Sequence, residues 1–181
     1  ENGVAVRKDV SSVAVENLKK EGVDALVVLG GDGTLTSARD FSRLGINVIG
    51  VPKTIDNDLM ATDRTFGFDT AVNIVTEALG RLHTTAESHH RVIVVEVMGR
   101  NAGWIALYGG LAGSADIILL PEIPYYINVI TDVINRRSRE GKPFTILAVA
   151  EGAISKEDAK LKKKEYKEKI SKRKYPSIAY E

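Results

Sequence analysis

The chain has 181 residues, a hydrophobic share of 44% and a formal net charge of +1 at pH 7, enough for one ordinary domain or parts of two with a packed core. It has no cysteine, which excludes disulfides and thiolate catalysis and favours a reducing cytosol. Because no apolar run approaches the length of a membrane span and residues 7–9 are charged, we expect a cytoplasmic protein with no membrane partner.

Helical and strand-like patterns alternate along the whole chain. Helical spacing predicts helices at 13–22, 35–45, 69–88, 102–113 and 127–140, and continuous apolar runs predict strands at 24–31, 47–51, 91–97, 115–121 and 143–152. Five apolar strands alternating with helices predict an α/β fold, with Rossmann-like parallel sheets that carry helices on both faces. A boundary near Gly67 would divide the chain into parts of two lobes, 1–67 and 68–181.

The last segment is strongly basic. Residues 1–155 contain 15 Lys/Arg and 19 Asp/Glu, whereas residues 156–181 contain 10 and 5. Glutamates alternate with the lysines, no aromatic platform for bases is visible, and Leu161, Tyr166 and Ile170 are spaced as on one stripe of an exposed helix. We therefore expect a final solvated helix from residue 156 and no nucleic-acid partner.

The first polar motif is LGGDGTLTSA, residues 29–38, between a predicted strand and a helix. Its glycines let the backbone approach an anion closely, and the amides of the helix start point toward phosphate. Asp32 would repel a bare phosphate but can hold Mg²⁺ against phosphate oxygens. The alternative is a glycine turn in which Asp32 caps the helix.

The second motif is PKTIDND, residues 52–58, just past a strand. If this segment is extended, Thr54, Asp56 and Asp58 share one face. One carboxylate is enough to accept the proton of an attacking hydroxyl, a second can orient metal-bound water, and Lys53 can neutralise charge on a donor phosphate. The alternative is an Asx-rich turn held by its own backbone bonds.

Two further strand ends carry EVMGRNAGW, residues 96–104, and AEGA, residues 150–153. Gly99 and the amides after it face the same sheet edge, and Arg100 can grip a phosphate in fork geometry. Glu151 could accept hydrogen bonds from sugar hydroxyls, or cap a helix. The histidines at 83, 89 and 90 are expected at the surface, and Trp104 in the core.

In this order and spacing, GGDGT, PKTIDND, MGRNAGW and AEG closely resemble the 6-phosphofructokinase family, from about Glu16 to Gly152. The resemblance implies the phosphofructokinase fold and phosphorylation of fructose 6-phosphate at its 1-hydroxyl with a Mg²⁺-bound donor, in glycolysis. It implies that Asp56 is the catalytic base and that Thr54 lies near the transferred phosphoryl group. The other matched positions are Gly31, Gly33 and Thr34 at the nucleotide phosphates, Asp32 at magnesium, Met98, Gly99 and Arg100 at the substrate, with Arg100 also stabilising the transition state, and Glu151 at the sugar hydroxyls.

The resemblance also has implications for the oligomeric state and for the phosphoryl donor. Arg91 matches an arginine lent to a neighbouring subunit's sugar-phosphate site, which implies a homo-oligomer, usually a tetramer. Family members that use pyrophosphate typically carry an acid where this chain has Gly33, and a lysine where it has Lys53. We weigh Gly33 more heavily and expect ATP, with pyrophosphate as the alternative.

Parts of the family pattern are missing. Its N-terminal glycine-rich loop and its C-terminal phosphate-clamping arginines and histidine have no counterpart within residues 1–181, as in the middle of a longer enzyme. Such a segment alone would be weakly active or inactive. Lipid and NAD kinases of the diacylglycerol-kinase type share GGDGT but lack PKTIDND followed by MGR. A non-enzymatic alternative is an inactive, nucleotide-binding regulatory fragment.

Overall fold

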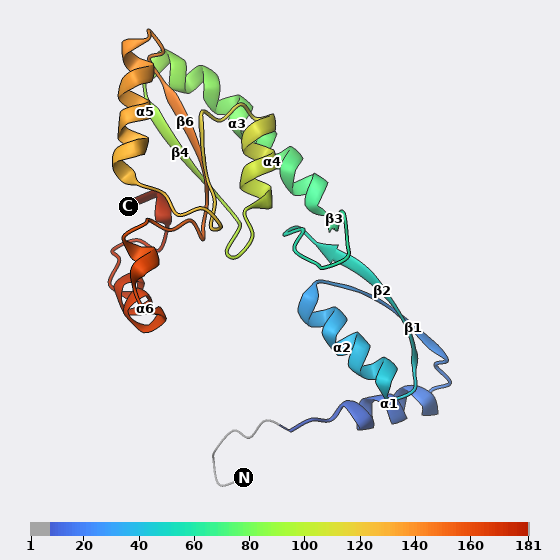
Figure 1. Ribbon diagram of the computed structural model, residues 1–181. Coiled ribbons are helices and arrows are strands. Elements are labelled where there is room, and N and C mark those ends of the chain that lie inside the picture. Colours follow the sequence, from blue (N-terminus) through green and yellow to red (C-terminus); the bar gives the residue numbers. More distant parts are fainter. Residues whose placement is uncertain (1–7, 181) are drawn as a thin grey trace. The chain divides into compact units, whose positions relative to one another are not determined.

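The computed structural model describes residues 8–180 and divides into two compact units, each built around a three-stranded sheet (Figure 1). The first unit extends to Thr54 and includes Leu59–Phe66. The second contains Ile55–Asp58 and the chain from Gly67 onward. Arg7, the first of the charged residues noted near the start, lies outside the described residues.

The first unit contains two helices and a parallel pair of strands. Strand β1 (Ala25–Gly30) runs parallel to β2 (Asn47–Thr54), and the short β3 (Phe66–Gly67) completes the sheet order β1-β2-β3. Helix α1 (Ser11–Lys20) precedes β1, and α2 (Asp32–Arg43) connects β1 to β2. Helix α2 begins earlier than its spacing predicts, because Gly31 takes the N-cap position and Asp32, Gly33 and Thr34 already lie in the first turn.

One face of this first sheet is bare in the described chain. Val27, Leu29 and Ile49 are 65%, 61% and 64% exposed. Helix α2 covers the other face, where Leu35 packs closely over Gly50. Within residues 8–180, the sheet of the first unit is therefore covered on one face only.

The second unit confirms the prediction of parallel strands with helices on both faces. Strands β4 (Val92–Val97), β6 (Thr145–Ala150) and β5 (Ile117–Leu119) are parallel in the order β4-β6-β5. Helices α3 (Phe68–His89) and α4 (Trp104–Ala112) pack on one face, and α5 (Ile127–Arg139) with the 3₁₀ turn η2 (Ile178–Tyr180) on the other (Figure 1).

Strand β6 is the centre of this core, and all six of its residues are buried. Ile146 and Ala148 join the α3 cluster with Leu79 and Ala86. Leu147 and Val149 join the opposite cluster, which contains Ile130 of α5 and Ile178 of η2. Since successive side chains of a strand point to opposite faces, one short apolar run supplies both clusters.

Two predictions about single residues are wrong. Trp104 is 40% exposed, because α4 buries its small residues, including Ala106 and Gly109, against α3 and the sheet. His83 is partly buried, with Nε2 2.9 Å from the carbonyl oxygen of Gly113 and the ring edge-on to another aromatic ring. His89 and His90 are exposed, as predicted.

The basic segment is not one continuous helix. It forms a 3₁₀ turn, η1 (Asp158–Lys160), and the separate helix α6 (Lys163–Ser171), with Leu161 extended between them and thus outside the expected stripe. The buried Asp158 carboxylate accepts from Lys169 Nζ at 2.6 and 2.7 Å, which fixes α6 to the unit. Within residues 8–180, no helix is both long and apolar enough to cross a membrane.

Candidate active site

The turns that follow β4 and β6 are locked together by their backbones. The Glu151 amide donates to the Val97 carbonyl at 2.9 Å, and the Gly152 amide to the Gly99 carbonyl at 3.0 Å. A Cβ atom on Gly152 would lie only 2.0 Å from the Arg100 carbonyl oxygen, so a larger residue does not fit. Gly99 has φ of +153°, and its own Cβ would lie 2.9 Å from a backbone oxygen. Glycines at both positions therefore let the two turns meet.

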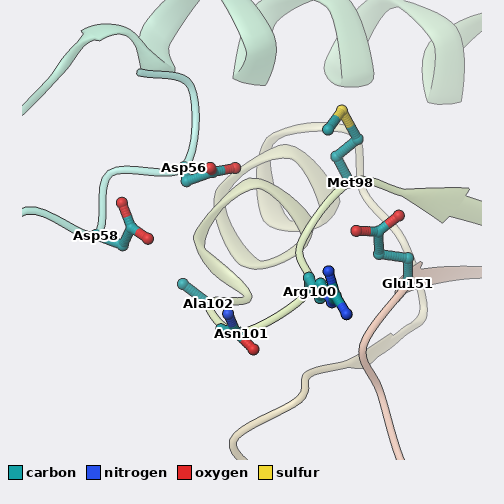
Figure 2. A pocket seen from close by; sticks show the side chains of 7 residues that line it. All are labelled: Asp56, Asp58, Met98, Arg100, Asn101, Ala102 and Glu151. Carbon is teal, nitrogen blue, oxygen red and sulfur yellow. The ribbon is translucent and has the colours of Figure 1, made fainter. Parts of the chain in front are cut away.

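A pocket of about 260 Å³ opens over these two turns. Figure 2 shows Asp56 and Asp58 on one side of it, and Met98, Arg100 and Glu151 on the other. The acids come from the stretch that follows β2, Met98 and Arg100 from the end of β4, and Glu151 from the end of β6. Five residues that sequence motifs singled out, spread over almost a hundred positions, thus line one pocket of the second unit.

The stretch that carries the two acids is not extended, contrary to expectation. Strand β2 ends at Thr54, the chain bends at residues 55–56, and Asn57 has a left-handed φ of +53°. Asparagine tolerates this conformation better than other residues with a side chain. The prediction that Thr54, Asp56 and Asp58 share one face of an extended segment therefore fails. Asp56 and Asp58 nevertheless both line the pocket, on a segment that bends.

The pocket carries three carboxylates and one guanidinium. Within the described chain, no ion pair joins Arg100 to Glu151, so both charges remain available to a ligand. Carboxylates accept hydrogen bonds from hydroxyl groups, and a guanidinium donates to phosphate in a planar fork. The pocket therefore suits a polyhydroxylated ligand with an anionic group near Arg100. Glu151 lies in a turn and not at the start of a helix, which removes its alternative assignment as a helix cap.

The glycine motif lies at the end of β1 in the first unit. A Cβ atom on Gly30 would lie 2.4 Å from the Thr34 Cβ, so the tight turn into α2 needs glycine there. Gly31 is the N-cap, and Asp32 is the first helical residue, with no side-chain capping bond in the described structure. The alternative of Asp32 as the helix cap is therefore wrong. A Cβ atom on Gly33 would meet nothing within 4 Å.

Lys53 and Thr54 end the neighbouring strand β2. Gly30 is paired with Pro52 in the β1–β2 register, and a Cβ atom on Gly31 would lie 3.6 Å from the Thr54 Cβ. The glycine motif and the start of the second motif thus share one sheet edge, as the rule for parallel strands predicts. The described residues contain no group of three or more His, Cys, Asp or Glu side chains that could hold a metal ion by themselves.

Arg91 is the one predicted site residue of the second unit that lies far from the pocket. It directly precedes β4, whereas Met98 directly follows that six-residue strand, so the two are separated by about 20 Å of strand. Its backbone carbonyl accepts from the Thr145 amide at 3.2 Å. A role for Arg91 in this chain's own pocket is thereby excluded, and a role in a neighbouring copy stays a prediction.

The motifs did not single out Asn101 and Ala102, which also line the pocket. Both follow Arg100 in the MGRNAG motif, so their position in the sequence was the available signal. The turn is supported from outside by Glu122, whose Oε1 accepts from the Gly103 amide at 2.8 Å at the start of α4. Only the fold brings Glu122, nineteen residues away, to this turn.

A parallel α/β fold whose strand ends carry acids, an arginine and a glycine turn defines a class of proteins that bind phosphorylated ligands. Within it, the family model described as Phosphofructokinase matches residues 3–179. The chain therefore belongs to the phosphofructokinase family.

Relatives agree with this assignment. The chain is 74% identical over 157 residues to "ATP-dependent 6-phosphofructokinase 2" of Clostridium perfringens, covering 87% of this chain and 43% of that protein. It is 53% identical over 167 residues to "ATP-dependent 6-phosphofructokinase" of Spirochaeta thermophila, covering 92% and 46%. The chain thus spans less than half the length of these curated relatives.

Solved structures show the same fold. Phosphofructokinase from Saccharomyces cerevisiae matches with a TM-score of 0.74 and 37% identity, over 80% of this chain and 23% of that one. "Pyrophosphate-dependent phosphofructokinase" from Marinobacter aquaeolei matches with a TM-score of 0.73 and 29% identity, over 84% and 43%.

Proposed function

We propose that this chain is the central part of a longer, cytoplasmic 6-phosphofructokinase of glycolysis. That enzyme transfers a phosphoryl group from Mg²⁺-bound ATP to the 1-hydroxyl of fructose 6-phosphate. The pocket that joins Asp56, Arg100 and Glu151 carries the proposal, because it combines a proton acceptor, a phosphate-binding cation and an acceptor for sugar hydroxyls.

This geometry supports the proposed sugar side of the reaction. Asp56 takes the proton of the 1-hydroxyl, the freed oxygen forms a bond to the terminal phosphorus of the donor, and the bond to the leaving phosphate breaks. Arg100 stabilises the negative charge of the transferred group. Glu151 accepts from sugar hydroxyls, Met98 forms part of the wall beside the sugar, and Gly99 allows the turn that carries Met98 and Arg100.

The donor is assigned to the first unit. The amides at the start of α2, from Gly31 to Thr34, face the donor phosphates, and Lys53 neutralises their charge. Asp32 is exposed, lies on the first turn of α2 and forms no capping bond there, so its carboxylate is free to meet a cation. Mg²⁺ is commonly held by one or two carboxylates together with substrate phosphates, so an isolated acid fits it without a three-residue cluster. The ion would neutralise phosphate charge.

ATP is favoured over pyrophosphate as the donor. The space next to Gly33 is open in the described structure, which suits a donor larger than pyrophosphate. The curated relatives named above are called ATP-dependent. Lys53 and the likeness to a pyrophosphate-dependent structure keep pyrophosphate as the second candidate. The inactive regulatory fragment is disfavoured because Asp32, Thr54, Asp56 and Arg100 are all present.

For assembly, we infer a homo-oligomer, most simply a tetramer. Arg91 lies at the end of β4 opposite the pocket and is exposed, so it is available to a neighbouring copy.

The proposal is tested by forming fructose 1,6-bisphosphate with the longer protein, with Mg-ATP and Mg-pyrophosphate assayed side by side. Asp56→Asn should lower turnover by roughly 10²–10⁴ while binding of fructose 6-phosphate is kept, because a general base is lost. Asp132→Asn is the matched control, since Asp132 is an exposed acid on α5 far along the chain from every site motif. Equal turnover of the two variants would refute the role of Asp56, and product from neither donor would refute the function.

A further inference from the structure

A second pocket adjoins the first and is larger, with a volume of about 580 Å³. The two share Arg100, Asn101 and Glu151, so a ligand in one lies next to a ligand in the other. Its outer wall is formed by α6 and the segment after it, which contribute Lys163, Tyr166, Lys167, Ile170 and Arg173. The basic segment is therefore not simply a solvated helix, because one of its faces lines a cavity.

The spacing on α6 explains this face. Lys163 and Lys167 are four residues apart, as are Tyr166 and Ile170, so each pair lies on one side of the helix. Helix α6 is held in place by Lys169, which pairs with the buried Asp158 carboxylate at 2.6 Å. Its first turn is closed by Glu165, which accepts from the Lys162 amide at 2.9 Å. The lysines that face the pocket thus stand on a fixed helix.

Their charges are available to a ligand. Within residues 8–180, neither Lys163 nor Lys167 takes part in an ion pair, although Lys169 of the same helix and Lys172, just after its end, both do. Arg173, the next cation of the wall, is half-buried and already has a partner within the described chain, so the two lysines are the cations that remain available. A cation beside a cavity rather than beside an acid is a favourable partner for an anion that enters from solution.

The two adjoining pockets have opposite charge. The first holds three carboxylates and one guanidinium. The second holds four cations and two carboxylates. One of these two, Glu96, is already engaged by Ser177 and by the Ala179 amide at 3.2 Å. The first pocket therefore suits hydroxyl groups, and the second suits a phosphate.

We propose that Lys163 and Lys167 of α6, in the pocket that Arg173 also lines, form an anion site that binds the phosphate group of a small phosphorylated molecule. Two sources share this chemistry: the phosphate of the sugar phosphate in the first pocket, or a separate phosphate compound that binds beside it. The first source rests on the proposed function. Binding of phosphate itself does not depend on any turnover.

The test is calorimetric titration of residues 1–181 with inorganic phosphate at fixed ionic strength. The double variant K163Q/K167Q should weaken binding about tenfold or more, because two charged hydrogen-bond donors are lost. K160Q/K164Q is the control, since it removes the same charge at the same spacing from exposed residues outside the pocket. It should change the Kd less than about twofold, because these exposed side chains do not line the pocket and their charges are screened by salt.

Competition separates the two sources. If fructose 6-phosphate displaces inorganic phosphate from wild-type chain and fructose does not, the site takes the sugar's own phosphate. If both bind together, the site takes a separate molecule, and phosphate should then change the KM of the longer enzyme for fructose 6-phosphate in the wild type but not in K163Q/K167Q. The site is refuted if wild-type chain binds no phosphate, or if both double variants weaken binding equally. Loss of activity on Asp56→Asn tests the proposed function separately, since phosphate binding should survive that change.

Discussion

The two sheets of this protein differ in how completely their strands are covered. Strand β6 of the second unit is buried along its whole length, with α3 on one face and α5 on the other. In the first unit, β1 and β2 leave Val27, Leu29 and Ile49 more than 60% exposed. Similar apolar runs in the sequence thus have different surroundings in the structure. An apolar composition allows a strand to be buried on both faces, but the helices that pack on the sheet determine which of its side chains are buried.

The largest difference in stability is expected between two isoleucine variants, one in each sheet. Ile146→Ala should lower the free energy of unfolding by about 4 kcal/mol, because Ile146 is 0% exposed and the change leaves a cavity. Ile49→Ala should cost less than about 1 kcal/mol, because its side chain is 64% exposed. Urea unfolding of both variants measures the difference. Equal losses would mean that the face of β2 is covered in solution, and the contrast between the two sheets would not hold.

The next effect concerns a partly buried ion pair that ties the second unit together. Arg137 Nη2 of α5 lies 2.6 Å from Asp116 Oδ1, with both side chains 17% exposed, and Arg137 Nε donates to the Thr145 hydroxyl. Asp116 Oδ2 also accepts from the Ile146 amide at 2.9 Å. Arg137→Met should destabilise by about 3 kcal/mol, because it leaves a carboxylate without its cation in a partly buried place.

The first unit provides the control for this ion pair. Arg43 and Asp40 lie 3.5 Å apart on α2 with side chains 69% and 47% exposed. Arg43→Met should therefore change stability by less than about 0.5 kcal/mol, as surface pairs usually do. Thermal unfolding of both variants measures the two losses of stability. If Arg43→Met lost as much stability as Arg137→Met, burial would not explain the strength of the Arg137–Asp116 ion pair.

A smaller effect is expected at two glycines that sequence alone does not distinguish. Gly152→Ala should cost about 2 kcal/mol, because the new methyl would lie 2.0 Å from the Arg100 carbonyl oxygen. Gly33→Ala should leave stability within about 0.5 kcal/mol, because its Cβ would meet nothing within 4 Å. Under the proposed function, Gly152→Ala should also raise the KM of the longer enzyme for fructose 6-phosphate by moving Arg100. If Gly152→Ala were as stable as wild type, the close approach of the two turns would be wrong.

The sequence predicted the parts of the fold that depend on local pattern. Helix α3 and strand β6 follow from long periodic runs, and the parallel arrangement follows from their alternation. The pocket followed from one topological rule, that parallel strands end at one sheet edge, which is why Asp56, Arg100 and Glu151 could be grouped in advance.

The failures share a different cause. The exposed Trp104 and the pocket-lining face of α6 each depend on contacts between distant segments. Trp104 was expected in the core because α4 is apolar all round, but the close contact of α4 with α3 uses its glycines and small residues instead. Periodicity shows which residues share a face and does not show what that face meets.

The smallest effect is expected at the start of the first unit, and it depends on pH. The hydroxyl of Ser11 and then its backbone amide, which donates to Asp9 Oδ1 at 2.9 Å, hold the pKa of the Asp9 carboxyl below its ordinary value of 3.8. The pKa of Asp9 is lower in the folded chain than in the unfolded chain. The ionised Asp9 carboxylate therefore stabilises α1 at any pH above the unfolded pKa, and this stabilisation is lost as the pH falls through the folded pKa. Nuclear magnetic resonance of α1 amides between pH 6 and pH 2 should therefore show an acid-induced loosening that Asp9→Asn removes. The amides of β6 should not respond to this substitution, and a response there would mean that the two units are energetically coupled through α1.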